Sequence, residues 1–245
     1  MSDFSIMQRV KHKFATPFVR RMLGRRSIFE VREELAQRYL KGQGVEIGGL
    51  NSPLKVPTCA TVRYADIKPL GELKAHYADI SIIQRPDILT DLESLDVIPD
   101  ASLDFFIANH VLEHVENPLR ALQSVRRVLR SRGIAFIALP DKRYTFDKLR
   151  TVTPLDHLIR DFEDGPEWSA YGHYCDWAQN VEGLRNKEAV DRASILMSGR
   201  DNIHFHTWDF AAMAELFSYT QRITGLTVKH SQQNRSECIW ILTAR

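Results

Sequence analysis

Polar side chains capable of binding a ligand stand at the ends of several short apolar segments in the first half of the chain. Glu46 and Asp66 each lie at or near the end of such a segment, and Asn109 and His110 directly follow another. In a doubly wound sheet, ligands bind outside the carboxyl ends of the strands. A carboxylate that ends the second strand suits the two hydroxyls of a ribose, and Asp66 follows Glu46 by the roughly 20 residues expected for that role. These residues predict a nucleoside site.

The loop after Glu46 indicates what kind of nucleoside is bound. It reads Gly48-Gly49-Leu-Asn-Ser-Pro, without the third glycine of the GxGxxG pattern that binds a dinucleotide pyrophosphate. A P-loop of the GxxxxGK[ST] type is absent from the sequence as well. The loop therefore favours a nucleoside cofactor without phosphates over a nicotinamide dinucleotide.

A second set of candidate residues lies beyond residue 140. His157, His173, His204 and His206 are four of the nine histidines of the chain. Histidine titrates near neutral pH and is a common general base, so His204, His206 and His173 are the candidate catalytic residues. Two alternatives stay open, because these histidines could instead form a structural cluster or, together with Asp176, a metal site. We expect no metal.

The elements that position these residues follow from capping signals and apolar periodicity. Ser27 and Glu30 have the spacing of a capping box, which predicts a helix to about Lys41, and Asn117-Pro118 begins a second helix. Between and after them, short apolar runs predict strands. The expected strands cover residues 45–48, 61–66, 86–89, 102–108, 134–139, 226–230 and 237–243.

This order predicts an α/β protein with a doubly wound, mostly parallel seven-stranded sheet. The last two strands form an antiparallel hairpin at its edge. We expect a basic helical N-terminal extension over residues 1–41 and one domain over residues 42–245. Residues 141–208 break the strand–helix rhythm and form a helical insertion after the fifth strand, facing the acceptor.

The composition of the chain restricts its cellular location and its partners. Three separated cysteines predict neither a disulfide framework nor a zinc knuckle, and no apolar run is long enough for a membrane span, so we expect a cytoplasmic protein. Residues 1–41 hold ten Lys and Arg against four acids. This basic segment is either a cap helix with a solvated face or a contact with the inner membrane surface or an acidic partner. It shows no nucleic-acid reading motif.

Together, the motifs resemble the class I methyltransferases, and most closely the type 11 methyltransferase-domain proteins. The resemblance covers about residues 42–140 and rests on Val45–Gly48, Asp66, Asp91, the run Leu103–Val115 and the approach Val128–Gly133. It implies S-adenosylmethionine as the cofactor. Glu46 and Gly48, with Gly49, would flank its methionine part, Asp66 would bind the ribose, Asp91 and Leu92 would lie along the adenine, and Asn109 and His110 would lie beneath the sulfonium.

The insertion resembles a bacterial subgroup often associated with surface-polysaccharide pathways. That resemblance points to a hydroxyl of a glycan or other small molecule as the acceptor. The substrate-binding candidates are Asp141, Arg143, Tyr144, His157 and Trp208. Transfer to nitrogen or carbon, and an inactive scaffold that keeps the fold, remain alternatives. The oligomeric state is open.

Overall fold

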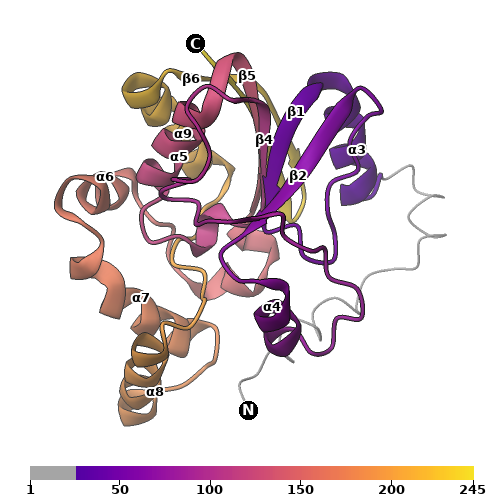
Figure 1. The fold of residues 1–245 in the computed structure, drawn as a ribbon. Coiled ribbons are helices and arrows are strands. Elements are labelled where there is room, and N and C mark those ends of the chain that lie inside the picture. The colour runs from indigo at the N-terminus through magenta and orange to yellow at the C-terminus, as the bar shows by residue number, and fades with distance from the viewer. Residues whose placement is uncertain (1–25) are drawn as a thin grey trace.

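The computed structural model describes residues 26–245, which contain a seven-stranded sheet in the order β3-β2-β1-β4-β5-β7-β6 (Figure 1). Strands β1 to β5 are parallel, whereas β7 runs antiparallel to both β5 and β6. This arrangement confirms the predicted doubly wound sheet with a C-terminal hairpin. The strands are β1 (Gly42–Ile47), β2 (Ala60–Asp66), β3 (Ile88–Leu89), β4 (Leu103–Asn109), β5 (Leu129–Pro140), β6 (Leu226–Asn234) and β7 (Glu237–Ala244).

Alternating side chains send the sheet's apolar residues into two layers. Phe106 on β4 and Ile137 on β5 pack with helices α5 (Pro118–Val128) and α9 (Phe210–Thr224) on one face. Phe105 and Phe136 point to the other face, which α3 (Ile28–Tyr39) covers. Figure 1 shows α5 and α9 on one side of the sheet and α3 on the other. The polar residues at the strand ends are thereby held on a rigid support.

Helix α5 and strand β5 differ from the predicted boundary. The fifth strand was expected to begin at residue 134, but the helix ends at Val128 and β5 begins directly at Leu129. Arg132 has a φ of 66°, and a Cβ on Gly133 would lie 2.9 Å from the Arg130 carbonyl oxygen. Gly133 therefore permits a tight irregularity inside the strand rather than ending the helix.

Helix α3, which the sequence assigned to an N-terminal extension, is part of the core. The Ser27–Glu30 capping box forms as predicted, with both reciprocal hydrogen bonds present. Val31 and Leu35 are buried against the sheet. The buried Arg32 guanidinium donates to both carboxylate oxygens of Glu237 at the start of β7. The helix is thus fixed to the carboxyl edge of the sheet, while the rest of the expected extension, residues 1–25, lies outside the described residues.

Breaking this ion pair should destabilise the protein strongly. Arg32→Ala removes the guanidinium from the buried Glu237 carboxylate, which then keeps only His110 beside it, and loss of one partner of a buried pair costs about 3–5 kcal/mol. Urea denaturation followed by circular dichroism would measure the change. Arg26→Ala is the control, because its ion pair with Glu34 is exposed and should contribute less than about 1 kcal/mol. Equal, small losses for both variants would show that α3 is not anchored in this way.

The insertion is helical, as predicted. Two short 3-10 turns, η2 (Lys142–Tyr144) and η3 (Phe146–Leu149), follow β5. Helices α6 (Leu155–Asp164), α7 (Glu167–Asn180) and α8 (Asn186–Gly199) come next, and the chain then returns to the sheet through the extended residues 201–208. Helices α7 and α8 extend beyond the sheet layers in Figure 1. Among the helices of residues 26–245, none is long and apolar enough to span a membrane.

Candidate active site

The parallel strands end together at one edge of the sheet. Ile47 pairs with Ala65 of β2 and with Ala108 of β4, so the residues following these positions lie side by side. On β5, Ala138 pairs with Asn109. The antiparallel β7 begins at this same edge. The predicted cofactor residues are therefore brought to one region of the surface.

Glu46 fastens the glycine loop to the sheet. Its side chain is fully buried, and its two carboxylate oxygens accept the Leu54 backbone N–H at 3.0 and 2.9 Å. Asn109 Nδ2 donates to the same carboxylate at 3.4 Å. Burial raises the pKa of Glu46 to about 7, against the opposing effect of these hydrogen bonds. Asn109 Oδ1 is buried without a hydrogen-bond partner within residues 26–245, which leaves an acceptor free at the strand end.

Gly48 and Gly49 shape the loop that Glu46 holds. Gly48 has a φ of 69°, and a Cβ there would lie 2.7 Å from Val111 Cγ2. A Cβ on Gly49 would come within 3.6 Å of Tyr64, Glu46 and Pro53. Without side chains at these two positions, the backbone of the loop is open to the close approach of a ligand.

Gly48→Ala is expected to distort this loop. The left-handed conformation costs an alanine roughly 1–2 kcal/mol, and the contact with Val111 adds to that cost. Thermal unfolding should show a lower Tm, and affinity for the cofactor should fall with it. Gly71→Ala is a matched control, because a Cβ at Gly71 meets nothing within 4 Å. A Gly48→Ala protein with unchanged Tm and unchanged affinity would contradict this account of the loop.

Asp66 closes β2 with a carboxylate that is only half buried. Its Oδ1 accepts the Lys68 backbone N–H at 3.1 Å, and the backbone N–H of Ile67 also stabilises the carboxylate. Burial raises the pKa of Asp66. A half-buried carboxylate at this strand end can accept hydrogen bonds from ribose hydroxyls, as predicted from its place in the sequence.

Asp91 and Leu92 are placed differently from the prediction. Asp91 Oδ1 accepts the backbone N–H groups of Glu93 and Ser94 at 2.6 and 3.1 Å, and its Oδ2 accepts the Ser94 hydroxyl at 3.2 Å. The Leu92 side chain packs in the hydrophobic core. Leu92 can therefore contact an adenine only through its backbone. Asp91 organises the turn that presents this backbone.

His110 is the partly exposed histidine at this edge. It follows β4 with a φ of 57°, and 38% of its side chain is exposed. Its Nε2 lies 3.0 Å from Glu237 Oε2, and its Nδ1 lies 3.5 Å from Glu113 Oε1. Burial lowers the pKa of His110, but the two carboxylates raise it more, to about 9. A histidine held between two buried carboxylates is a strong proton acceptor.

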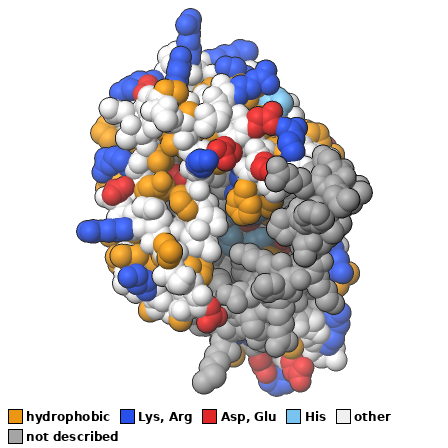
Figure 2. Space-filling view, turned by 90° about the vertical axis from the view of Figure 1, so that its right-hand side faces the viewer, with side chains coloured by type: hydrophobic (Ala, Val, Ile, Leu, Met, Phe, Trp, Pro, Cys, Tyr) orange, Lys and Arg blue, Asp and Glu red, His pale blue; other side chains and the backbone are white. Residues whose placement is uncertain are grey.

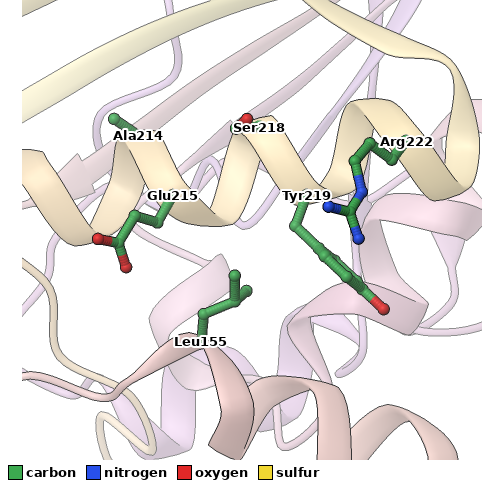
Figure 3. A pocket seen from close by; sticks show the side chains of 6 residues that line it. All are labelled: Leu155, Ala214, Glu215, Ser218, Tyr219 and Arg222. Atoms are coloured by element: carbon green, nitrogen blue, oxygen red, sulfur yellow. The ribbon is translucent and has the colours of Figure 1, made fainter.

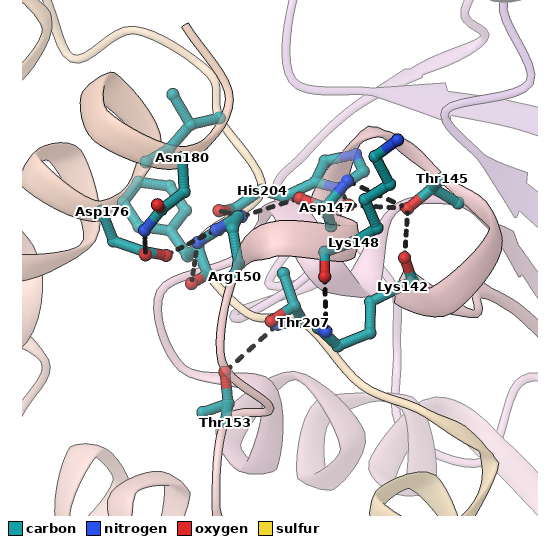
Figure 4. Close-up of polar contacts among 12 residues, drawn as sticks. Lys142, Thr145, Asp147, Lys148, Arg150, Thr153, Asp176, Asn180, His204 and Thr207 are labelled. Carbon is teal, nitrogen blue, oxygen red and sulfur yellow. Dashed lines mark hydrogen bonds and ion pairs between the residues drawn. The ribbon is translucent and has the colours of Figure 1, made fainter. Parts of the chain in front are cut away.

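His204 does not face solvent, contrary to its predicted catalytic role. Its Nδ1 lies 2.7 Å from Asp147 Oδ2, and Arg150 donates to Asp147 Oδ1 at 3.0 Å (Figure 4). The ring packs edge-on against His114. Only 6% of the side chain is exposed. His204 therefore has no direct path to an acceptor and belongs to a buried polar cluster.

His206 is also unsuited to be the base, and the half-buried His173 is in contact with another histidine. His206 is fully buried, and its Nε2 lies 3.1 Å from the Glu116 carbonyl oxygen. His173 Nε2 lies 3.1 Å from His157 Nε2. Asp176, the acid considered with them, instead accepts from Arg150 and Asn180. The His-x-His pair is thus divided between two clusters, because each ring is held by different parts of the insertion.

Two groups within residues 26–245 bring histidines and acids close enough to hold a metal ion. One contains Glu113, His114 and His204, and the other contains His157, Asp161, His173 and His206. In each group the candidate ligand atoms lie within 4.8 Å of one another.

The predicted substrate residues divide by exposure. Arg143 and Tyr144 are at least partly exposed on η2, and His157 is partly exposed on α6. Asp141 is fully buried, where it accepts from Arg143 and Gln233, and Trp208 is buried in the core. The prediction that Asp141 and Trp208 touch the substrate does not fit this structure, because neither side chain reaches the surface.

Two surface hollows lie elsewhere. One of about 370 Å³ lies between α9 and the start of α6, lined by Leu155, Tyr219 and Arg222 among others (Figure 3). The other, of about 510 Å³, lies beside β1, β2 and β3. Neither is lined by any of the predicted cofactor residues. Figure 2 shows the face on the right-hand side of Figure 1, where hydrophobic side chains stand among basic and acidic ones. The strand-end edge remains the candidate site because the polar side chains suited to a nucleoside cofactor lie there.

Comparison with known families decides the class. Residues 49–137 match the family model described as "Methyltransferase domain". This segment, which is less than half of the chain, is similar to a methyltransferase domain. It contains the loop after Glu46, the Asp66 strand end and the Asn109–His110 strand end, and its family uses S-adenosylmethionine. A search of curated protein sequences found no match.

Solved structures share the fold of this methyltransferase domain. A Thermotoga maritima protein, described as a possible histamine N-methyltransferase, shares 15% sequence identity with this chain, with a TM-score of 0.50 and coverage of 98% of this chain and 100% of its own. A Rhodobacter sphaeroides protein, described as a candidate Zn-dependent alcohol dehydrogenase, has 14% identity, a TM-score of 0.55, and coverage of 91% and 92%. The chain spans 49% of the CurJ carbon methyltransferase structure. At these identities the likeness concerns the fold alone.

The residues of the methyltransferase domain fit its cofactor. The loop backbone at Gly48 and Gly49 carries no side chains, Asn109 Oδ1 is a buried acceptor without a partner in residues 26–245, and the Asp66 carboxylate is half buried at the end of β2. Sequence reasoning did not assign a role to Glu237. It is an acid that begins an otherwise apolar strand, and antiparallel pairing with β5 brings it to the carboxyl edge. An acid at the start of an apolar strand is the sequence signal that could have identified Glu237 as a site residue.

Proposed function

We propose that this protein transfers the methyl group of S-adenosylmethionine to a hydroxyl of a small molecule or glycan. The observation that carries the proposal is the gathering of Glu46, Asp66 and Asn109 at one sheet edge, beside the partly exposed His110. The first three would hold the cofactor. His110 would remove the proton of the acceptor hydroxyl.

Methyl transfer requires no covalent bond between the protein and either substrate. The bound cofactor would supply an electrophilic methyl group, so the chain must orient an acceptor in line with it and remove a proton. We assign the proton to His110 Nδ1, whose 3.5 Å contact with Glu113 is the longer of its two carboxylate contacts. Glu237 would hold the other nitrogen, as a carboxylate holds histidine in hydrolase triads. Glu113 would stabilise the imidazolium that results. The exposed Arg143 and Tyr144 would contact the acceptor.

This assignment replaces the insertion histidines as the base. The exposure of His110 supports the change, because a base must reach the proton it removes. The insertion would then act by covering and shaping the acceptor side. We retain a cytoplasmic location and, through the basic N-terminal segment, contact with the inner membrane surface or an acidic partner, as parts of the proposal.

Incubation with S-[methyl-³H]adenosylmethionine and a bacterial extract separated into glycan, small-molecule, protein and nucleic-acid fractions tests the proposal. We expect label in the glycan or small-molecule fraction, as methyl ether. Label released as methylamine would establish nitrogen as the acceptor, and label on carbon would do the same for carbon. Cofactor binding without label in any fraction would favour the scaffold alternative.

A further inference from the structure

Three histidines and an aspartate converge inside the insertion. His157 and Asp161 lie one turn apart on α6 and project from the same face of that helix. His173 comes from α7, and His206 comes from the extended segment before α9. His157 Nε2 lies 3.1 Å from His173 Nε2 and 3.2 Å from Asp161 Oδ2. His206 Nε2 lies 4.0 Å from the same Asp161 oxygen.

The group is buried and incompletely hydrogen-bonded. Asp161 and His206 are both 0% exposed. Asp161 Oδ2 and His206 Nδ1 have no hydrogen-bond partner within residues 26–245. Buried polar atoms are normally paired, so these two indicate a missing partner. A cation at the centre of the group would supply it.

The surrounding contacts are those that orient metal ligands. Ser169 Oγ donates to Asp161 Oδ1 at 2.9 Å, which leaves Oδ2 directed toward the histidines. The Glu116 carbonyl oxygen lies 3.1 Å from His206 Nε2 and fixes that ring. Carboxylate and imidazole ligands in metal sites are usually held by such outer hydrogen bonds.

We propose that His157, Asp161, His173 and His206 bind one Zn²⁺ ion. Tetrahedral zinc with ligands at about 2.0–2.1 Å places neighbouring ligand atoms about 3.3 Å apart, close to the 3.1 and 3.2 Å observed around His157. Three imidazoles favour zinc over magnesium or calcium, which prefer oxygen. Four protein ligands close the coordination sphere. The ion is therefore structural, and it joins α6 and α7 to the segment that returns the chain to the sheet.

Metal analysis of the full-length chain, purified without a histidine tag, tests the site. Mass spectrometry of the metal content should find about one zinc per chain. His173→Gln should lose the zinc, whereas the matched variant His204→Gln, in the neighbouring histidine group, should keep it. Ser169→Ala should retain the fold and bind zinc about 10- to 100-fold more weakly, because it frees the Asp161 carboxylate.

Two measurements on the unmodified chain avoid any dependence on the folding of a variant. A chelator should lower Tm, and added Zn²⁺ should restore it. Co²⁺ in place of zinc should give the intense visible absorption of a tetrahedral ion. The proposal is overturned if the chain takes up no zinc and its Tm does not change with either chelator or Zn²⁺. It is also overturned if His173→Gln retains zinc, or if only His204→Gln loses it, since the ion would then lie at Glu113, His114 and His204.

Discussion

Replacing Asp66 with alanine is expected to weaken binding of S-adenosylmethionine by at least about 100-fold. The half-buried carboxylate would accept hydrogen bonds from both ribose hydroxyls, and each hydrogen bond to a charged group contributes about 1.5–3 kcal/mol. Isothermal titration calorimetry would measure the change in Kd.

Asp79→Ala is the control for this experiment, because Asp79 is an exposed acid with no place at the strand-end edge. The control should bind as the unaltered protein does. Both variants should unfold at similar temperatures, since the hydrogen bonds of Asp66 are local ones to the backbone of Ile67 and Lys68. Unchanged affinity in Asp66→Ala would remove Asp66 from the cofactor site.

The second large effect is expected at His110. His110→Ala should lower kcat by about 10²- to 10⁴-fold, the usual contribution of a positioned general base, and change cofactor affinity little. His230→Ala, on strand β6, is the control and should keep full activity. The assay would measure the rate at which labelled methyl enters the extract fraction that accepts it.

The pH dependence separates a base from a merely structural histidine. The pKa of His110 is raised to about 9, so it is largely protonated at pH 7 and loses its proton as pH rises. A base must be unprotonated, and the rate should therefore increase with pH and level off above about 9. Glu237→Gln removes a negative charge that raises this pKa, so the rise should move to lower pH. A rate that is flat from pH 6 to 10, with unchanged activity in His110→Ala, would exclude this role.

The fold could be predicted largely from the sequence because its signals are local. Apolar runs of strand length, the Ser27 capping box and the Asn117-Pro118 helix start each form as expected. The strand-end acids follow from the same reasoning, since parallel strands end at one edge. What local patterns could not show was whether α3 belongs to the core, because that depends on the long-range contact between Arg32 and Glu237.

The acceptor side was harder to predict because residue type does not reveal burial. His204 and His206 have the chemistry of a base, but tertiary packing puts both inside the insertion. Trp208 and Asp141 were placed at the surface for the same reason, and both are buried. His110 was assigned to the cofactor alone, since its contact with Glu237 depends on the long-range pairing of β7 with β5.

The most direct test of the central claim is calorimetric titration of the unaltered protein with S-adenosylhomocysteine, beside a parallel titration with NAD. The strand-end residues and the phosphate-free glycine loop predict one binding site per chain for S-adenosylhomocysteine and no heat of binding for NAD. Binding of NAD with no response to S-adenosylhomocysteine would contradict the account and assign the sheet edge to a different cofactor.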